Sequence, residues 1–262
     1  MTIDVDGTRI GFEDRGTGTA VVFLHAFPLS AAMWAAQETA LGGRFRVVRV
    51  DARGFGSSEQ GTVPLSMDVL AGDAAAVMDH LGIDRAVVLG CSMGGYAALA
   101  FARLFAARLR GLVLVDTKAA PDSDEARAGR ATLARAVQER GAIAVAEAML
   151  PKLVGATTHR ERPQVVEAIR AAIVAAAPRA IVGALQAMAA RPDSRPLLPS
   201  VVAPTLVIRG EEDAIITEDD ARLLHEGIRG SRLRTLAGTG HLPSLETEGP
   251  FNEALASFVD AL

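Results

Sequence analysis

The segment 90–94, Gly-Cys-Ser-Met-Gly, constrains the fold of this chain more than any other feature. The apolar run 86–89 before it predicts a buried strand, and residues 95–102 after it predict a helix. A turn this sharp between strand and helix would bring flanking side chains into collision, and glycine on both sides of Ser92 removes them. The serine hydroxyl then stands above the sheet edge, near the positive end of the helix dipole. Ser92 is therefore predicted to be a nucleophile.

Composition restricts the kind of protein this chain can be. A length of 262 residues fits one main domain with an insertion, and half of the residues are hydrophobic. No apolar run approaches the ~20 residues of a membrane helix, and the first residues lack a basic flank and an apolar signal segment. The single cysteine, Cys91, fits a reducing compartment. With a net charge of −4 and no basic stripe, we expect a cytoplasmic protein that binds neither membrane nor nucleic acid.

Strand and helix patterns alternate along most of the chain. Runs such as residues 20–24 are apolar throughout, which is typical of strands buried on both faces. The alternation predicts an α/β fold with a mostly parallel sheet covered by helices on both sides. Strands are expected at 2–5, 9–14, 20–24, 46–50, 86–89, 112–115, 205–208 and 232–236, and helices at 66–81, 93–107, 217–228 and 250–261.

One long connection interrupts this alternation. Between the strands ending near Val115 and starting near Thr205 the chain shows only helical patterns. We expect residues 118–200 to form a helical cap over the sheet edge, inserted into a core made of residues 1–117 and 201–262. The cap helices are expected at 123–140, 142–150, 164–177 and 179–190.

A serine nucleophile needs a general base, and the chain has five histidines. His241 lies in the glycine-containing loop 238–243, directly after the last predicted strand, from where it can reach the edge that carries Ser92. We therefore expect His241 to be the base. His25 more plausibly braces its own loop, and surface positions are expected for the other three, His80, His159 and His225.

The carboxylate that orients the base is expected to be Asp213. It follows the strand 205–208 and emerges at the same sheet edge, between Ser92 and His241 in chain order. Asp116, which ends the strand after the nucleophile strand, is the alternative. Asp51 also ends a strand, but the glycine-rich segment after it favours a role in organising a turn.

Two backbone N–H groups are needed to bind the oxyanion of an acyl-transfer reaction. One is expected from Met93, the residue after the nucleophile, and the other from Phe27, in the turn after the strand 20–24. Trp34 lies just downstream of this turn and is a candidate for binding substrate, with ordinary core packing as the alternative.

Together these segments resemble the α/β-hydrolase fold superfamily over nearly the whole chain. The resemblance implies an eight-stranded sheet with one antiparallel strand near its start. Within the superfamily the chain is similar to short-cap carboxylesterases, cofactor-free perhydrolases and enol-lactonases. Ala26 departs from the glycine that many relatives carry there, and alanine would be strained if that position required a positive φ. The matching segments are 25–28, 51–58, 90–94, 210–213 and 240–243.

The resemblance also narrows the chemistry. Serine at the elbow differs from the aspartate of epoxide hydrolases and haloalkane dehalogenases, and Cys91 lies one place before the position of a cysteine nucleophile. We expect a serine hydrolase of small to medium carboxylic esters with no metal or organic cofactor. Lactone hydrolysis and perhydrolysis use the same triad, and a non-catalytic small-molecule receptor on this fold is the alternative outside enzymes. The oligomeric state is left open by the sequence.

Overall fold

Eight strands form one sheet in the order β1-β2-β4-β3-β5-β6-β7-β8 in the computed structural model, which describes residues 1–262. Strand β2 is antiparallel to both of its neighbours, and every pair from β4 to β8 is parallel. The expected eight strands with one antiparallel strand near the start are therefore confirmed. The strands are β1 (Thr2–Val5), β2 (Thr8–Arg15), β3 (Ala20–Leu24), β4 (Arg46–Val50), β5 (Ala86–Cys91), β6 (Leu109–Val115), β7 (Thr205–Gly210) and β8 (Arg232–Leu236).

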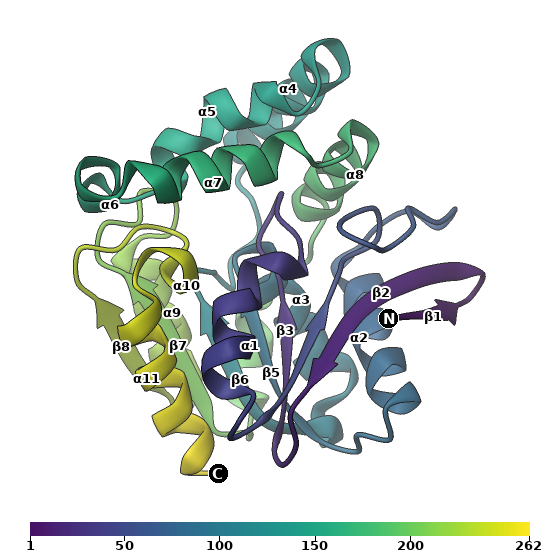
Figure 1. Cartoon of the computed structure of the whole chain (residues 1–262), viewed down its shortest axis with the longest axis vertical. Helices are drawn as coiled ribbons and strands as arrows, with labels where there is room; N and C mark the ends of the chain where they lie inside the picture. The colour runs from purple at the N-terminus through teal and green to yellow at the C-terminus, as the bar shows by residue number, and fades with distance from the viewer.

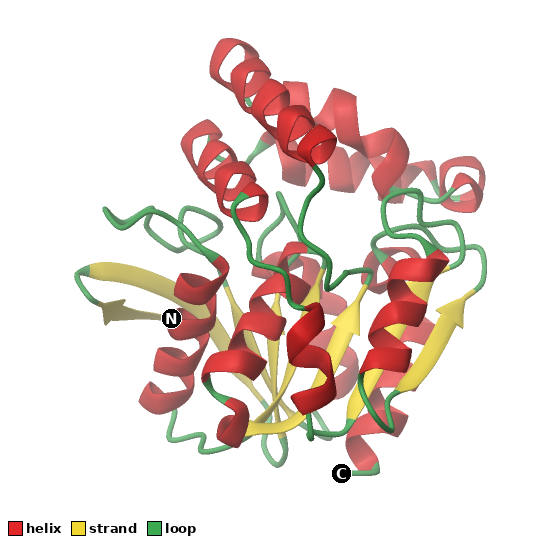
Figure 2. Cartoon of the chain, turned by 180° about the vertical axis from the view of Figure 1, so that it is seen from behind, coloured by secondary structure: helices red, strands yellow, loops and turns green.

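Helices cover both faces of the sheet (Figures 1 and 2). In Figure 1, α1 and α11 lie in front of the sheet, and α2 and α3 lie behind it. Every residue of β3 and β5 is buried as a result, which explains why their sequences are apolar without alternation. The helices of the core are α1 (Ala35–Leu41), α2 (Met67–His80), α3 (Met93–Leu104), α9 (Glu218–Gly227), α10 (Pro243–Glu246) and α11 (Glu248–Asp260), with 3₁₀ turns η1 (Ala31–Trp34), η2 (Ala106–Arg108) and η3 (Arg195–Ser200).

Five further helices between β6 and β7 form a separate layer beyond one end of the sheet (Figure 1). We call this segment, residues 124–189, the helical insertion. Its buried side chains recur at helical spacing, as Val166, Ile169 and Ile173 do in α7. The helices are α4 (Asp124–Arg140), α5 (Ile143–Leu153), α6 (Ala156–Glu161), α7 (Pro163–Val174) and α8 (Pro178–Ala189).

Three helices, α1, α6 and α10, were not expected from the sequence, and α10 has only four residues. Helix α6 consists of the mostly polar residues 156–161, and α1 has only seven residues, so neither shows an apolar period over several turns. None of the helices is by itself long and apolar enough to cross a membrane. Helices α7 and α8 together have the length and apolar composition of a membrane span, but the two are bent by 95° to each other.

Strand register brings the predicted site residues to one edge. Gly90 of β5 pairs with Leu24 of β3, and Cys91 pairs with Val115 of β6. On the other side, Val115 pairs with Ile208 of β7. Because these strands are parallel, the loops that follow them all leave the same end of the sheet, below the helical insertion (Figure 2).

Candidate active site

Ser92 has a backbone conformation that residues other than glycine rarely adopt, with φ 52° and ψ −112°. A Cβ atom on Gly90 would lie 2.0 Å from the carbonyl oxygen of Gly94, and one on Gly94 would lie 2.1 Å from that of Leu24. Both glycines are therefore required by close backbone contacts. The hydroxyl of Thr117 donates to the Ser92 carbonyl oxygen at 2.9 Å and helps to hold this strained turn.

His241 and Asp213 form a buried hydrogen-bonded pair. Nδ1 of His241 lies 2.7 Å from Oδ2 of Asp213, and the side chains are 1% and 0% exposed. This distance lies within the range of a hydrogen bond between the two side chains. A carboxylate at Nδ1 favours the tautomer that carries its proton there, which leaves Nε2 free to accept a proton.

The surroundings of Asp213 favour its ionised form. Its Oδ1 accepts hydrogen bonds from the N–H groups of Ile215 at 2.7 Å and Ile216 at 3.1 Å. Burial acts to raise the pKa of Asp213, but the charge and hydrogen bond of His241, together with the hydrogen bond from the N–H of Ile215, hold it below the usual value.

Asp116, the alternative acid, lies beside this pair, but the carboxyl group hydrogen-bonded to Nδ1 of His241 is that of Asp213. Oδ1 of Asp116 accepts from the N–H of Gly210 at 2.9 Å. Side-chain atoms of Asp116, Asp213 and His241 lie within 4.8 Å of one another, close enough to ligate a metal ion. A metal bound at Nδ1 of His241 would have to displace the proton that joins His241 to Asp213.

The two amides expected at the oxyanion site have no acceptor inside the protein. Neither the N–H of Phe27 nor that of Met93 donates a hydrogen bond to another protein group. Met93 is the first residue of α3, where backbone N–H groups have no partner within the helix. Ala26 does not have a positive φ, so alanine is not strained at this position.

A model of the family described as alpha/beta hydrolase fold matches residues 19–248. The chain belongs to this family. Among solved structures, an esterase from Thermogutta terrifontis has a TM-score of 0.95 and 40% identity, covering 99% of this chain and 96% of that one. The enol-lactonase from Burkholderia xenovorans LB400 has a TM-score of 0.92 and 32% identity, covering 99% and 100%. A 3-oxoadipate enol-lactonase from Acinetobacter baylyi is 28% identical over 236 residues, 90% of this chain and 86% of the relative.

Two buried polar residues of this α/β hydrolase, His25 and Asp51, support the loop after β3. His25 is buried, with Nδ1 3.0 Å from the carbonyl oxygen of Ala26 and Nε2 accepting from the N–H of Ala52 at 2.9 Å. Burial lowers the pKa of His25, consistent with a neutral ring that braces the loop. Asp51 accepts from the N–H groups of Ala31 at 2.8 Å and Ser57 at 2.9 Å, as expected for a residue that organises a turn.

Trp34 is a core residue. It is fully buried, and its ring lies 5.2 Å from that of Phe23 and 6.1 Å from that of Phe251, measured between centroids. These contacts join η1 to the sheet and to α11. The structure therefore supports the packing alternative for Trp34 and gives no support to the substrate-binding role.

Glu246, which no sequence motif indicated, holds the loop of His241 in place. Its Oε2 accepts from the N–H groups of Gly240 at 3.0 Å and Gly155 at 2.8 Å, and its Oε1 accepts from that of Leu242 at 3.0 Å. One fully buried carboxylate thus binds the residues on both sides of His241 and a residue of the helical insertion. The sequence signal was a glutamate five residues after the histidine.

The same part of the helical insertion makes three more contacts with the loops of His241 and Asp213. The N–H of His241 donates to the carbonyl oxygen of Leu153 at 3.1 Å. Glu212, next to Asp213, accepts from the N–H of Thr157 at 2.8 Å and from its hydroxyl at 2.6 Å. The end of α5 and the start of α6 are therefore fixed to the loops that carry His241 and Asp213.

Replacing Glu246 with alanine should destabilise the protein strongly. The change leaves three backbone N–H groups without their acceptor in a buried environment, at a cost on the order of 3 kcal/mol or more. The measurement is the free energy of unfolding in denaturant. Glu253→Gln, at an exposed position of α11, is the control and should change this free energy by about 0.5 kcal/mol at most. Equal unfolding curves for the two variants would contradict this account of Glu246.

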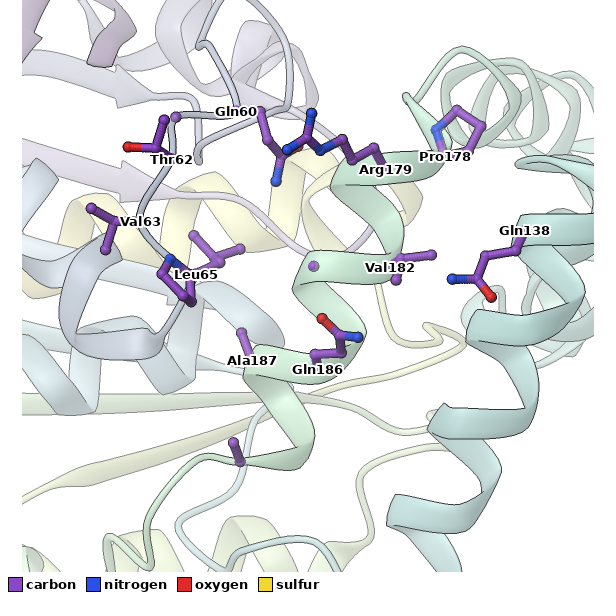
Figure 3. A pocket seen from close by; sticks show the side chains of 14 residues that line it. Gln60, Thr62, Val63, Leu65, Gln138, Pro178, Arg179, Val182, Gln186 and Ala187 are labelled. Atoms are coloured by element: carbon purple, nitrogen blue, oxygen red, sulfur yellow. The ribbon is translucent and has the colours of Figure 1, made fainter. Parts of the chain in front are cut away.

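A cavity of about 720 Å³ lies next to α8 (Figure 3). Residues 60–65 line one side of it and Gln138 of α4 contributes from the other, with Arg179, Val182 and Gln186 of α8 between them. Neither Ser92 nor His241 lines this cavity. It is therefore separate from the place where a nucleophilic attack by Ser92 would occur.

Proposed function

We propose that this α/β hydrolase is a serine esterase that cleaves small to medium carboxylic esters through an acyl-enzyme. Ser92 is the nucleophile, His241 the general base and acid, and Asp213 the carboxylate that orients His241. The observation that carries the proposal is the buried hydrogen bond of 2.7 Å between His241 and Asp213, at the same sheet edge as the strained turn of Ser92.

In this mechanism Nε2 of His241 takes the proton of the Ser92 hydroxyl as its oxygen attacks the ester carbonyl. The N–H groups of Phe27 and Met93 stabilise the negative oxygen of the tetrahedral intermediate. The imidazolium, held by the charge of Asp213, returns the proton to the leaving alcohol. Water then attacks the acyl-enzyme in the same way and releases the acid.

We also propose that residues 118–200 act as the cap of this site. The support is the position of the helical insertion over the edge from which the site loops emerge, and its hydrogen bonds to the loops of Asp213 and His241. A cap in this position would exclude water from the site and limit the size of the substrate.

Lactones are the second candidate substrates. Two of the similar proteins are named enol-lactonases, and a lactone is an internal ester that the same three residues could open. Opening a lactone keeps the leaving alcohol attached to the acyl group, so product stays in the site until deacylation.

The test is a substrate panel with p-nitrophenyl esters of increasing acyl length, several lactones, and the same esters with hydrogen peroxide added. We expect a burst of p-nitrophenol followed by steady turnover with short and medium esters. Turnover of lactones alone would assign the site to lactonases, and peracid formation would indicate perhydrolysis. Saturable binding without turnover of any compound would contradict the proposal and favour a receptor.

A further inference from the structure

Asp116, the residue directly after β6, carries a carboxyl group in an unusual environment. It is 1% exposed and has a φ of 40°, in the region that favours glycine. Its Oδ1 accepts one hydrogen bond, from the N–H of Gly210, whereas its Oδ2 is buried and has no donor as a partner. A buried carboxylate oxygen without a donor is unfavourable, which points to a proton on that atom.

The neighbour of Asp116 is Asp213, the acid of the proposed triad. Asp213 accepts three hydrogen bonds, two from backbone N–H groups at Oδ1 and one from His241 at Oδ2. Asp116 accepts only one. Two carboxyl groups this close in a buried site cannot both be ionised at neutral pH, and the group with more donors keeps the charge.

We propose that Asp116 is protonated in the folded protein and donates a hydrogen bond from Oδ2 to the carboxylate of Asp213. The inference rests on the proposed function in so far as it makes Asp116 a positioning residue of the triad. Asp116 then adds a fourth hydrogen bond to the three that Asp213 accepts from Ile215, Ile216 and His241. It also limits the charge facing His241 to a single carboxylate.

The groups around Asp116 favour the same assignment. The charges of Asp213 and Glu246 act on Asp116, and Asp116 in turn helps to raise the pKa of the buried thiol of Cys91. His241 lies in the same cluster as Asp116 and Asp213. Burial above all, then the charge of Asp213, raises the pKa of Asp116 well above its usual value, and the N–H of Gly210 opposes this only in part.

The first test compares Asp116→Asn with Asp116→Ala in the pH profile of kcat/KM. Asparagine keeps an oxygen for Gly210 and offers an N–H to Asp213, so it reproduces a protonated aspartate without a change of charge. We expect Asp116→Asn to cost less than about tenfold and to leave the acid limb of the profile in place. Asp116→Ala, which removes both hydrogen bonds, should lower kcat by about 10- to 100-fold with little change in KM.

The opposite assignment gives a different profile. If Asp116 were ionised, Asp116→Asn would remove a negative charge next to His241. The imidazole would then lose its proton more readily, and the acid limb would move to lower pH. Such a shift would overturn the proposal, and so would equal losses in the two variants.

The second test needs no enzymatic activity. A raised pKa means that the folded protein keeps a proton that the unfolded chain releases, so the stability due to this group is full below the unfolded pKa and falls as pH rises. Asparagine carries no such proton. The unfolding equilibrium constant of the wild type should therefore grow relative to that of Asp116→Asn by about tenfold per pH unit over roughly pH 5 to 7.

Asparagine tolerates a positive φ well, so Asp116→Asn can also stabilise the turn, but that contribution does not depend on pH. The control is Asp84→Asn at an exposed position, for which the ratio should not change with pH. A ratio that stays constant for Asp116→Asn would overturn the proposal. Because unfolding reports on the proton directly, this result remains valid even if the protein proves not to be an esterase.

Discussion

Replacing Ser92 with alanine is expected to lower ester turnover by about 10⁴-fold or more while leaving the fold intact. The hydroxyl of Ser92 is the only part of its side chain that takes part in the proposed ester hydrolysis. Alanine removes this hydroxyl without adding bulk to the strained turn. The oxyanion amides and the substrate contacts remain, so a small residual rate over that in water is expected. The measurement is kcat/KM for p-nitrophenyl acetate, together with the thermal unfolding curve.

Ser257→Ala is the matched control, because Ser257 is exposed on α11, on another part of the chain. It should keep its activity and its unfolding curve. A Ser92→Ala variant that is folded and retains a tenth of wild-type turnover would remove Ser92 as the nucleophile.

Replacing Asp213 with asparagine should reduce turnover by roughly 10²–10⁴-fold. Asparagine preserves the size of the side chain but removes the charge that stabilises the imidazolium. Its amide can also hold His241 in the tautomer whose Nε2 carries the proton, and that nitrogen cannot accept the proton of Ser92. The loss should appear in kcat rather than in KM, as measured by steady-state kinetics.

Asp116→Asn serves as the comparison for this variant, since both changes remove one buried carboxyl from the same cluster. A loss in Asp116→Asn as large as that in Asp213→Asn would contradict the assignment of the acid. It would place the orienting charge on Asp116 or divide it between the two residues.

The sheet could be predicted from the sequence because its strands are buried on both faces. Residues 20–24 and 86–89 are apolar throughout, and the structure places both in the centre of the sheet. Short elements such as α6 could not be predicted, because six mostly polar residues carry no period and their helix depends on contacts such as that of Thr157 with Glu212.

The local geometry of the proposed site could be predicted where the conformation of a turn depends on residues within that turn. Glycines around Ser92 and in the loop of His241 mark turns that few other residues allow. The position of Trp34 was not predictable, because a place in the core and a place in a pocket both suit a large aromatic residue. The three backbone contacts of Glu246 depend on loops that are distant in the sequence and meet only in the folded chain.

The strained turn of Ser92 and the His241–Asp213 pair both support Ser92 as the residue that forms the covalent bond with substrate. A fluorophosphonate reacts with an activated serine and leaves a stable adduct, which peptide mass spectrometry can locate. We expect one adduct per chain, on the peptide that contains Ser92, and none in the Ser92→Ala variant. An adduct on another residue, or no adduct in a protein that hydrolyses esters, would contradict the role of Ser92 as the nucleophile.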